Sequence, residues 1–418
     1  MRVYKFGGAS VKNADAVINI KEIIKSPTKH LVVLISAMDK TTNNLEKVWE
    51  FYINNDKPSS LIELEKTILF HKDIYNHLKL KNNTFFTSYF NSLVEQIKSF
   101  ISQPNNGNHA YCYDQIVSYG ELFSTWIISN YLNANGIKNV WLDARELIHT
   151  SNHYQEGRVN WEKSKQQILS KTTSDETVYI SQGFIGSDDK NYTTTLGREG
   201  SDYSAAIFAW ALNAKELVIW KDVPGLLNAD PKVFKDTQKI DHISYKEAIE
   251  LSYYGASVIH PKTIKPLQNK SIPLTIRSFL NYDEKGSEIN KYGGKDESVT
   301  SLIYKPNQVL ISISPKDYSF ILEDHMSELF GIFAQTGLKV HLMQNSALSF
   351  SVCAHIKTPL IPVLIEKLDE KYLVKYNEQV DLLTIRHYQD NKLPEFLAEK
   401  EILIEQRSRS TIRYVLKK

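Results

Sequence analysis

The sequence predicts an α/β protein with a main domain built on a parallel sheet, followed by a smaller α+β region. Leu31–Ile35 form a continuous apolar run without alternation, which is typical of a strand buried on both faces of a parallel sheet. Similar runs recur with helical segments between them, the pattern of a sheet covered by helices. With 418 residues, 42% hydrophobic and 23% charged, the chain has ordinary globular composition and room for two or three domains.

The first element is a short β-prone segment, Val3–Phe6, which Gly7 and Gly8 interrupt. The residues after it repeat apolar side chains along one face of a helix: Ala16, Val17, Ile20, Ile23 and Ile24. We expect a further helix at Ser201–Leu212 and further buried strands at Val140–Asp143, Val178–Ser181 and Leu217–Trp220. These elements assign residues 1–300 to one α/β domain with a three-layer arrangement, helices lying on both sides of the sheet.

A helix-rich insertion interrupts this domain at about residues 43–110. Its apolar side chains recur at helical spacing and predict packing seams, without a residue pattern that indicates chemistry. The stretch Gly286–Asn307 is rich in Gly, Lys, Ser and Asn, which is typical of the end of a domain and a linker.

Residues 307–418 contain a weak internal repeat that predicts two similar modules. Gln308–Ile313 resembles Gln379–Ile385, and His341–Val352 parallels Leu403–Val415. Each copy has the order strand, helix, strand, turn, strand, and the second copy is abridged. Chance similarity between two β-rich stretches is the alternative explanation.

Charge, cysteine content and hydropathy exclude several classes of protein. The 50 Lys and Arg residues against 48 Asp and Glu give a formal net charge of +2, which argues against a nucleic-acid binder. Two cysteines are too few for a disulfide scaffold or a cysteine-rich zinc site. The apolar runs fall short of the ~20 residues that span a bilayer, and no apolar signal stretch follows Met1. We therefore expect a soluble, cytoplasmic protein without a nucleic-acid or membrane partner.

Two glycine-containing loops indicate a ligand site. Four of the 17 glycines lie from Gly183 to Gly200, within eighteen residues, and a helix follows directly. Such loops bring backbone N–H groups close to an anion, and the dipole of the helix favours negative charge there. Lys5–Ser10 has the same position between strand and helix, with a cation before its glycines. The two loops together predict a phosphate-bearing ligand at the strand ends, although each alone would also suit a plain turn.

No common phosphate-binding motif accounts for these loops. The sequence contains no G-x-x-x-x-G-K-[ST] loop, no G-x-G-x-x-G fingerprint and no His-Arg-Asp catalytic loop. A phosphotransferase with this sequence must therefore belong to another architecture.

An ordered set of motifs resembles the aspartate kinases, which are amino-acid kinases with C-terminal ACT modules. The motifs, in the order of the family, are Lys5–Ser10, Ser36-Ala37, Thr41–Asn43, Gly120-Glu121, Thr193–Asp202, Lys221–Gly225, Ala229–Pro231 and Tyr254–Pro261. The C-terminal repeat resembles the paired, ferredoxin-like ACT modules. The resemblance covers nearly the whole chain. Because the chain stops where bifunctional relatives continue into a homoserine dehydrogenase domain, we expect a monofunctional kinase.

The resemblance implies transfer of the γ-phosphoryl group of ATP to the β-carboxylate of L-aspartate, giving 4-phospho-L-aspartate. In the family this is the first step towards lysine, threonine and methionine. A carboxylate, with a reference pKa near ~3.9, is already a nucleophile at neutral pH and needs no general base. The site must instead align the reactants and neutralise charge, with Mg²⁺ arriving on ATP and no direct protein ligand.

The resemblance also assigns catalytic and substrate-binding residues. Lys5 would be the catalytic cation at the phosphates, oriented by Asp202. The substrate would be held by Ser36, Thr42, Glu121, Arg198 and Ser201, with Arg198 at its α-carboxylate and Glu121 at its ammonium group. As residue types alone, Asp202 and Glu121 would also suit charged positions at helix starts.

The nucleotide would contact a second set of residues. The resemblance implies that ATP lies against Lys5, Gly7, Gly8, Lys221, Asp222, Leu227, Lys232 and Ser257. Trp220, beside this set, is expected in the core.

Four positions depart from the pattern of the family. Ala9 replaces a threonine, and Ser257 replaces a lysine that touches the nucleotide in many members. Asp39 and Glu199 stand where glycine is usual, and their charge would weaken nucleotide binding or help to hold a metal. These departures keep a catalytically dead amino-acid sensor open as an alternative, beside a kinase for another amino acid such as glutamate. The unchanged catalytic residues favour the aspartate kinase.

The C-terminal region is expected to regulate the enzyme. The resemblance implies a homodimer or tetramer formed through the ACT modules, with lysine or threonine as effector. The effector pocket would include Met326, His341, Met343, Asn345 and Ser346. His341 takes a place where lysine-sensing relatives commonly carry Asp, so the identity of the effector stays open.

Overall fold

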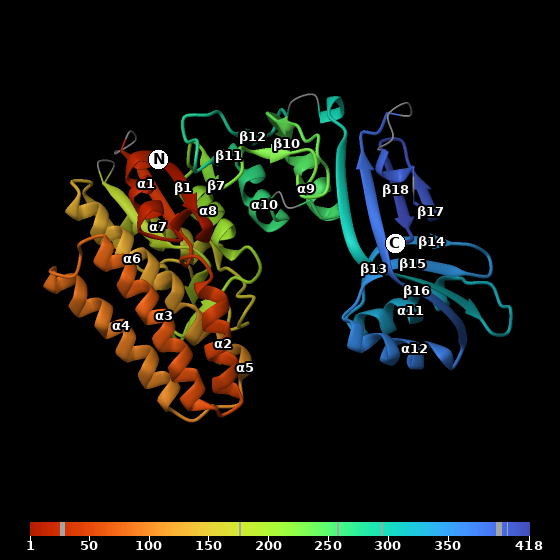
Figure 1. Cartoon of the computed structure of the whole chain (residues 1–418), viewed down its shortest axis with the longest axis horizontal. Coiled ribbons are helices and arrows are strands. Elements are labelled where there is room, and N and C mark those ends of the chain that lie inside the picture. The colour runs from red at the N-terminus through yellow and green to blue at the C-terminus, as the bar shows by residue number, and fades with distance from the viewer. Residues whose placement is uncertain (26–29, 175–176, 257–258, 294–295, 390–394, 399) are drawn as a thin grey trace. The chain divides into compact units, whose positions relative to one another are not determined.

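The computed structural model describes residues 1–25, 30–174, 177–256, 259–293, 296–389, 395–398 and 400–418. The contacts divide the chain into two compact units (Figure 1). The first unit comprises Met1–Leu226, Lys239–Ile249 and Ile259–Gly294, and the second comprises Leu227–Gln238, Glu250–Val258 and Lys295–Lys418. Two short segments from the N-terminal 300 residues are therefore part of the second unit.

The first unit is built on an eight-stranded sheet with the order β10-β12-β11-β7-β1-β2-β4-β3. Its strands are β1 (Arg2–Phe6), β2 (Leu31–Ile35), β3 (Asn139–Leu142), β4 (Val178–Gln182), β7 (Leu217–Lys221), β10 (His242–Ser244), β11 (Leu274–Ser278) and β12 (Ser287–Asn290). Neighbouring strands run parallel except for the pair β11 and β12. The expected parallel sheet is thus confirmed, and all five strands predicted from apolar runs belong to it.

Helices cover both faces of this sheet. Tyr4, Phe6 and Val33 share one core with side chains of α1 (Ala14–Ile24) and α6 (Tyr119–Ala134). Val3 and Lys5 alternate with Tyr4 and Phe6, so they point to the opposite face. There Lys5 meets Asp202 of α8 (Gly200–Ala211), against which α7 (Trp161–Lys171) and α10 (Pro261–Asn269) pack. Trp220 is buried between Tyr4 and Phe6, which confirms its place in the core.

Four helices occupy the region where the sequence predicts a helical insertion: α2 (Thr41–Ile53), α3 (Lys57–His77), α4 (Thr84–Ser102) and α5 (His109–Val117). Asp56, Asn83 and Asn108 cap the last three, because each side chain accepts a hydrogen bond from a backbone N–H of the first turn. The α3 helix packs against α2 and α4, and α4 packs against α6 (Figure 1). The insertion therefore extends the layer on the α6 side of the sheet.

Two small β-ribbons accompany the main sheet. The first pairs β5 (Ile185–Ser187) with β6 (Thr193–Thr195), directly before α8. The second pairs β8 (Leu226–Leu227) with β9 (Lys239–Ile240), and α9 (Tyr245–Tyr254) follows β10.

The second unit contains a six-stranded antiparallel sheet with the order β14-β15-β13-β16-β18-β17. Its strands are β13 (Ser301–Pro315), β14 (Lys339–Asn345), β15 (Phe350–His355), β16 (Tyr372–Arg386), β17 (Ile402–Arg407) and β18 (Thr411–Leu416). Two helices, α11 (Glu323–Thr336) and α12 (Ile361–Asp369), pack on it through Leu329, Phe333 and Leu364. This architecture agrees with the expected ferredoxin-like ACT modules.

The two copies of the repeat differ in their helix. The first copy has the expected order, with α11 between β13 and β14. In the second copy, the described residues between β16 and β17 contain only a 3₁₀ turn, Glu395–Leu397. The fifteen residues from His387 to Glu401 leave less chain for a helix than the first copy has. No helix in the described part of the chain is both long and apolar enough to cross a membrane.

Candidate active site

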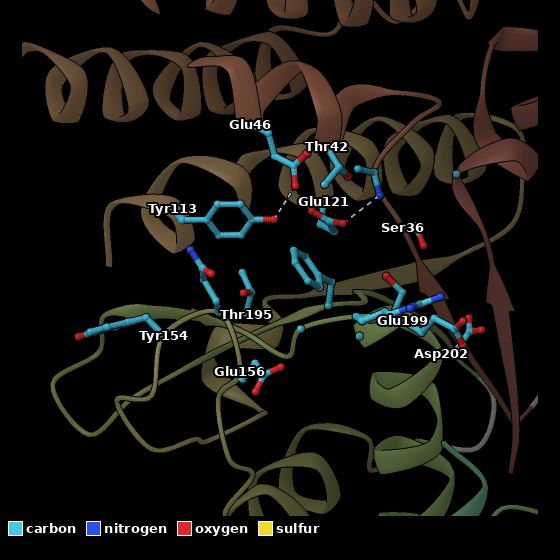
Figure 2. Close-up of a pocket in the computed structure, with 18 of the residues that line it drawn as sticks. Ser36, Thr42, Glu46, Tyr113, Glu121, Tyr154, Glu156, Thr195, Glu199 and Asp202 are labelled. Carbon is cyan, nitrogen blue, oxygen red and sulfur yellow. Dashed lines mark hydrogen bonds between the residues drawn. The ribbon is translucent and has the colours of Figure 1, made fainter. Parts of the chain in front are cut away.

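A cavity of about 930 Å³ opens in the first unit where β1, α2, α6 and α8 meet (Figure 2). The residues assigned to catalysis and substrate binding all line it: Lys5, Ser36, Thr42, Glu121, Arg198, Ser201 and Asp202. Gly8 lines it as well. The fold thus brings together residues from five separate motifs.

Lys5 and Asp202 form a buried ion pair at one end of this cavity. The Nζ of Lys5 lies 2.6 Å from Oδ1 of Asp202, and both side chains are more than nine-tenths buried. Burial alone would raise the pKa of Asp202, but Lys5, with a smaller contribution from Lys221, holds that pKa below its usual range. Asp202 is therefore an anion that fixes the ammonium group of Lys5 beside the cavity.

The glycines beside Lys5 leave room for close packing. A Cβ on Gly8 would come within 2.9 Å of the carbonyl oxygen of Ala37, and a Cβ on Gly7 within 3.6 Å of the Lys5 Nζ. Gly8 is thus needed for the approach of the β1 loop to the segment after β2. A small residue at both positions keeps the space in front of Lys5 open.

Glu121 places a second buried carboxylate in the cavity. Its side chain is 2% exposed, and its Oε1 accepts a hydrogen bond from the backbone N–H of Ala37 at 3.3 Å. Its Oε2 has no hydrogen-bond partner among the described residues. Burial raises the pKa of Glu121 to about 8. A buried carboxylate oxygen that lacks a partner suits a ligand that brings a cation or a hydrogen-bond donor.

The loop that carries Arg198 depends on close packing between β4 and α8. A Cβ on Gly183 would lie 2.7 Å from Cβ of Ser201, and one on Gly200 would lie 2.7 Å from the ring of Phe184. Glycine at both positions therefore lets the start of α8 approach the end of β4. Arg198 itself is exposed, at the mouth of the cavity.

Asp39 and Glu199, the two acidic residues at positions usually occupied by glycine, both have left-handed backbones, with φ of 47° and 54°. Glycine adopts such a conformation without strain, which explains the usual residue at these positions. Both line the cavity, and Glu199 Oε2 accepts a hydrogen bond from the backbone N–H of His260 at 2.9 Å. The carboxylate of Glu199 thus has a structural partner at the start of α10.

Several residues that line the cavity were not identified in the sequence. They include Glu46 and Trp49 on α2, Tyr113 on α5, Phe184 and Thr195. Figure 2 shows the phenol of Tyr113 directed at Glu46, and its hydroxyl donates a hydrogen bond to Glu46 Oε1 at 2.8 Å. Glu46, Trp49 and Tyr113 belong to none of the motifs, so only tertiary packing reveals them. Phe184 and Thr195 lie within the glycine-containing stretch, but the sequence assigned them no role.

The expected nucleotide residues are divided between the two units. Lys221 ends β7, the neighbour of β1, and Asp222 follows it in the same unit. Leu227 and Lys232 belong to the second unit, and Ser257 lies outside the described residues. In the described ranges, no three His, Cys, Asp or Glu side chains are grouped so that they could hold a metal ion.

The expected effector residues do not all share one environment. Met343, Asn345 and Ser346 form one exposed stretch at the end of β14. Met326 lies on α11 instead and packs, partly buried, against the hydrophobic core between α11 and the sheet. Nδ1 of His341 lies 3.2 Å from the Nζ of Lys305. Burial and this neighbouring cation lower the pKa of His341 to about 4.

Comparison with known proteins identifies the family. A sequence profile of the amino acid kinase family matches residues 1–278. Lysine-sensitive aspartokinase 3 of Escherichia coli (strain K12) is 30% identical over 354 residues, which are 84% of this chain and 77% of that protein. Chloroplastic aspartokinase 1 of Arabidopsis thaliana is also 30% identical, over 84% of this chain but 62% of its own length. The chain thus spans less than two thirds of the plant relative.

Solved structures agree over nearly the whole chain. E. coli aspartokinase III in complex with lysine and aspartate has a TM-score of 0.82 at 26% identity, covering 99% of this chain and 95% of that one. The same enzyme in complex with aspartate and ADP has a TM-score of 0.81 at 25% identity, covering 100% and 96%. The chain therefore belongs to the amino acid kinase family and, within it, to the aspartokinases.

Proposed function

We propose that this protein transfers the γ-phosphoryl group of ATP to the β-carboxylate of L-aspartate. The observation that carries the proposal is the convergence of the Lys5–Asp202 ion pair, Arg198 and the buried Glu121 on one cavity. The guanidinium of Arg198 and the carboxyl group of Glu121 in one pocket complement the α-carboxylate and the α-ammonium group of a free amino acid. The E. coli relative was solved with aspartate and with ADP, which supports the same pair of ligands here.

The residues would act by alignment and charge neutralisation. The β-carboxylate of aspartate is ionised at neutral pH, so no general base is needed for its attack. Lys5, held by Asp202, would neutralise charge that develops on the transferred phosphoryl group. Arg198, Glu121, Ser36, Thr42 and Ser201 would fix the amino acid in line with the γ-phosphate.

We assign the nucleotide to Gly7, Gly8, Lys221, Asp222, Leu227, Lys232 and Ser257, on the pattern of the family. A divalent metal, typically Mg²⁺, would accompany ATP and neutralise its phosphates. Magnesium on a nucleotide is held largely by phosphate oxygens and water, so it needs no group of three protein ligands, and the described residues contain none.

We further propose that residues 1–300 catalyse the reaction and that residues 307–418 regulate it as an ACT pair, in a homodimer or tetramer. Lysine is the first effector to test, because the relative named lysine-sensitive is 30% identical and its T-state structure contains lysine. Threonine is the second. Inhibition by lysine that Met343→Ala or Asn345→Ala weakens would support the exposed end of β14 as the effector site. If lysine inhibits both variants as strongly as it inhibits the wild-type protein, the effector does not bind at this location.

The reaction is tested by ADP release from Mg-ATP with L-aspartate, with L-glutamate, and without an amino acid. Hydroxylamine traps an acyl phosphate as a hydroxamate and so identifies the product. Turnover with aspartate alone, lost in Lys5→Ala, is the expected result. Turnover with glutamate instead would make the protein a kinase of another amino acid. No turnover, with calorimetric binding of an amino acid but not of Mg-ATP, would indicate the dead sensor.

A further inference from the structure

Asp114 is a buried acidic residue on α5 that lies outside the lining of the cavity. Its side chain is 0% exposed, and its carboxylate accepts hydrogen bonds from two distant segments. From Thr195 it accepts the backbone N–H at 2.9 Å and the hydroxyl at 2.7 Å. From Gln155 it accepts the backbone N–H, at 3.1 Å and 3.0 Å from its two oxygens. No cation neutralises it among these contacts.

Both partners of Asp114 line the cavity, and they also contact each other's segments. The N–H of Gly157, two residues after Gln155, donates to the carbonyl of Thr195 at 2.8 Å. A Cβ on Gly197 would lie 3.0 Å from the carbonyl oxygen of Gln155, so the two segments are in van der Waals contact just before Arg198. The position of Arg198 therefore depends on a packed pair of loops whose common anchor is Asp114.

The two neighbours of Asp114 on α5, Tyr113 and Gln115, form further hydrogen bonds to segments around the cavity. Tyr113 reaches Glu46 on α2, the helix that also carries Thr42. The side-chain amide of Gln115 donates to the carbonyl of Thr193 at 2.8 Å. Three consecutive residues of α5 thus connect α2, β6 and the Gln155 loop, and each of these three segments contributes lining residues to the cavity. Figure 2 shows Glu46, Tyr113 and Thr195 among them.

We propose that Asp114 is a positioning residue for the amino-acid substrate, because it holds the Gln155 and Thr195 segments in the arrangement that places Arg198 at the cavity. The inference deepens the proposed function and rests on it, since Arg198 matters only if an amino acid binds there. Asp114 touches no substrate in this assignment. It acts through the two loops.

The chemistry of the site favours a role beyond fold stability. An ionised carboxylate without a neighbouring cation is costly to bury, and burial raises the pKa of Asp114 to about 7. A neutral hydrophobic contact would hold two loops together at lower cost. Three donors from two segments, one of them shared by both carboxylate oxygens, instead fix the direction and distance of those segments, which is what alignment of a substrate requires.

The first test is Asp114→Asn in the full-length chain. The amide has the same shape, but its NH₂ group cannot accept the N–H of Gln155, which the two carboxylate oxygens share, so the Gln155 segment is held less firmly. We expect the KM for aspartate to rise roughly tenfold or more, while the KM for ATP changes less than about twofold. Ser129→Ala is the matched control, because it removes a partly buried hydrogen bond to Asn139 between two residues that do not line the cavity.

A second pair of variants covers the case in which Asp114→Asn does not fold. Thr195→Val removes the hydroxyl donor to Asp114, and Thr195→Ser keeps it. We expect a higher KM for aspartate in Thr195→Val alone. Where Asp114→Asn folds, the double variant Asp114→Asn/Thr195→Val should raise the KM for aspartate by less than the two single effects combined. Both substitutions disturb the hydrogen bond between the Thr195 hydroxyl and Asp114.

The outcomes separate the positioning role from the proposed function. A wild-type protein that turns over no amino acid overturns the proposed function, and with it this inference. If wild type turns over glutamate instead, the same KM comparison is made with glutamate. Wild-type turnover with an unchanged KM in Asp114→Asn, or in Thr195→Val if the former is unfolded, overturns the positioning role alone. A fall in thermal midpoint without a change in KM, as expected for Ser129→Ala, would mark Asp114 as purely structural.

Discussion

Glu199 and His260 are joined by a hydrogen bond of 2.9 Å from the backbone N–H of His260 to the carboxylate of Glu199. The bond links the Arg198 loop to the start of α10, where the His260 side chain accepts a hydrogen bond from the N–H of Lys262. Glu199 keeps a left-handed backbone, with φ of 54°, that a non-glycine residue adopts only at a cost of order 1 kcal/mol. The hydrogen bond offsets this cost.

Substitution of Glu199 should separate two contributions to stability, that of the hydrogen bond to His260 and that of the strained backbone at Glu199. Glu199→Ala loses the bond and keeps the strained backbone, whereas Glu199→Gly loses the bond and relieves the strain, by about 1 kcal/mol. We expect the thermal midpoint to fall in Glu199→Ala and to change little in Glu199→Gly. Glu199→Gln, which keeps an oxygen acceptor, is the control. Equal midpoints in the alanine and glycine variants would show that the backbone conformation is not strained.

The Lys5–Asp202 pair should be strongly coupled in stability. Lys5→Ala leaves a buried carboxylate without its cation, which costs about 3–5 kcal/mol, whereas the double variant Lys5→Ala/Asp202→Ala removes both charges. We therefore expect the double variant to be more stable to denaturant than Lys5→Ala alone. The exposed pair Lys163–Asp189, at 2.9 Å, is the matched control and should show much weaker coupling, because solvent screens its charges. Additive effects at Lys5 and Asp202 would argue against a buried ion pair.

The affinity for aspartate should depend on the ionisation of Glu121. Its raised pKa of about 8 means that protons compete with the substrate ammonium group as the pH falls through that value. The KM for aspartate should therefore rise as the pH is lowered from about 9 to about 7.5, a window just above the pKa of Asp114, about 7. Glu121→Gln should have a high KM that is nearly constant over this window. The same slope in both proteins would exclude Glu121 as the titrating group.

His71 should make the first unit sensitive to acid. Its ring is 0% exposed on α3, next to Phe70 and Phe123, and burial lowers its pKa from 6.5 to about 4. Between these values the unfolded chain binds a proton that the folded chain does not. The free energy of unfolding therefore falls with decreasing pH, by at most about 1.4 kcal/mol per pH unit from this group.

A matched pair of histidines tests this contribution. His71 and His77 lie on the same helix, and each ring contacts the carbonyl four residues earlier, but His77 is exposed. The free energy of unfolding is measured with denaturant at pH values from about 6.5 to about 4. Its dependence on pH should be weaker in His71→Leu than in the wild-type protein and unchanged in His77→Leu. Identical pH profiles for the two variants would contradict the assignment.

The sequence predicted those parts of the fold and site that local patterns encode. Apolar runs marked the buried strands, and glycines near a helix start marked the loops of Lys5 and of residues 183–200. The roles of Arg198 and Asp202 came from the resemblance to the aspartate kinases. The contribution of Asp114 could not be derived in this way, because its partners lie 41 and 81 residues away. The one local sign was an acid on the buried side of a helix, between Cys112 and Ile116.

The role of Glu199 was also beyond the sequence. Its charge suggested weaker nucleotide binding or a metal, whereas the structure pairs it with a backbone N–H 61 residues away. Every residue except proline has a backbone N–H, so the sequence does not indicate which N–H will meet the Glu199 carboxylate. Only the folded structure identifies this partner. Tyr113 was missed for a similar reason, because its side chain lies at the cavity only through the packing of α5 on β6.

The central position of β1 has a consequence for synthesis on the ribosome. β1 pairs with β2, which follows within thirty residues, but its other neighbour, β7, begins only at Leu217. At about 5–20 residues per second, the nascent chain carries an unpaired edge on β1 for roughly 10–40 seconds. Chains that terminate before Leu217 would keep that apolar edge exposed, and we expect them to depend on chaperones or to aggregate.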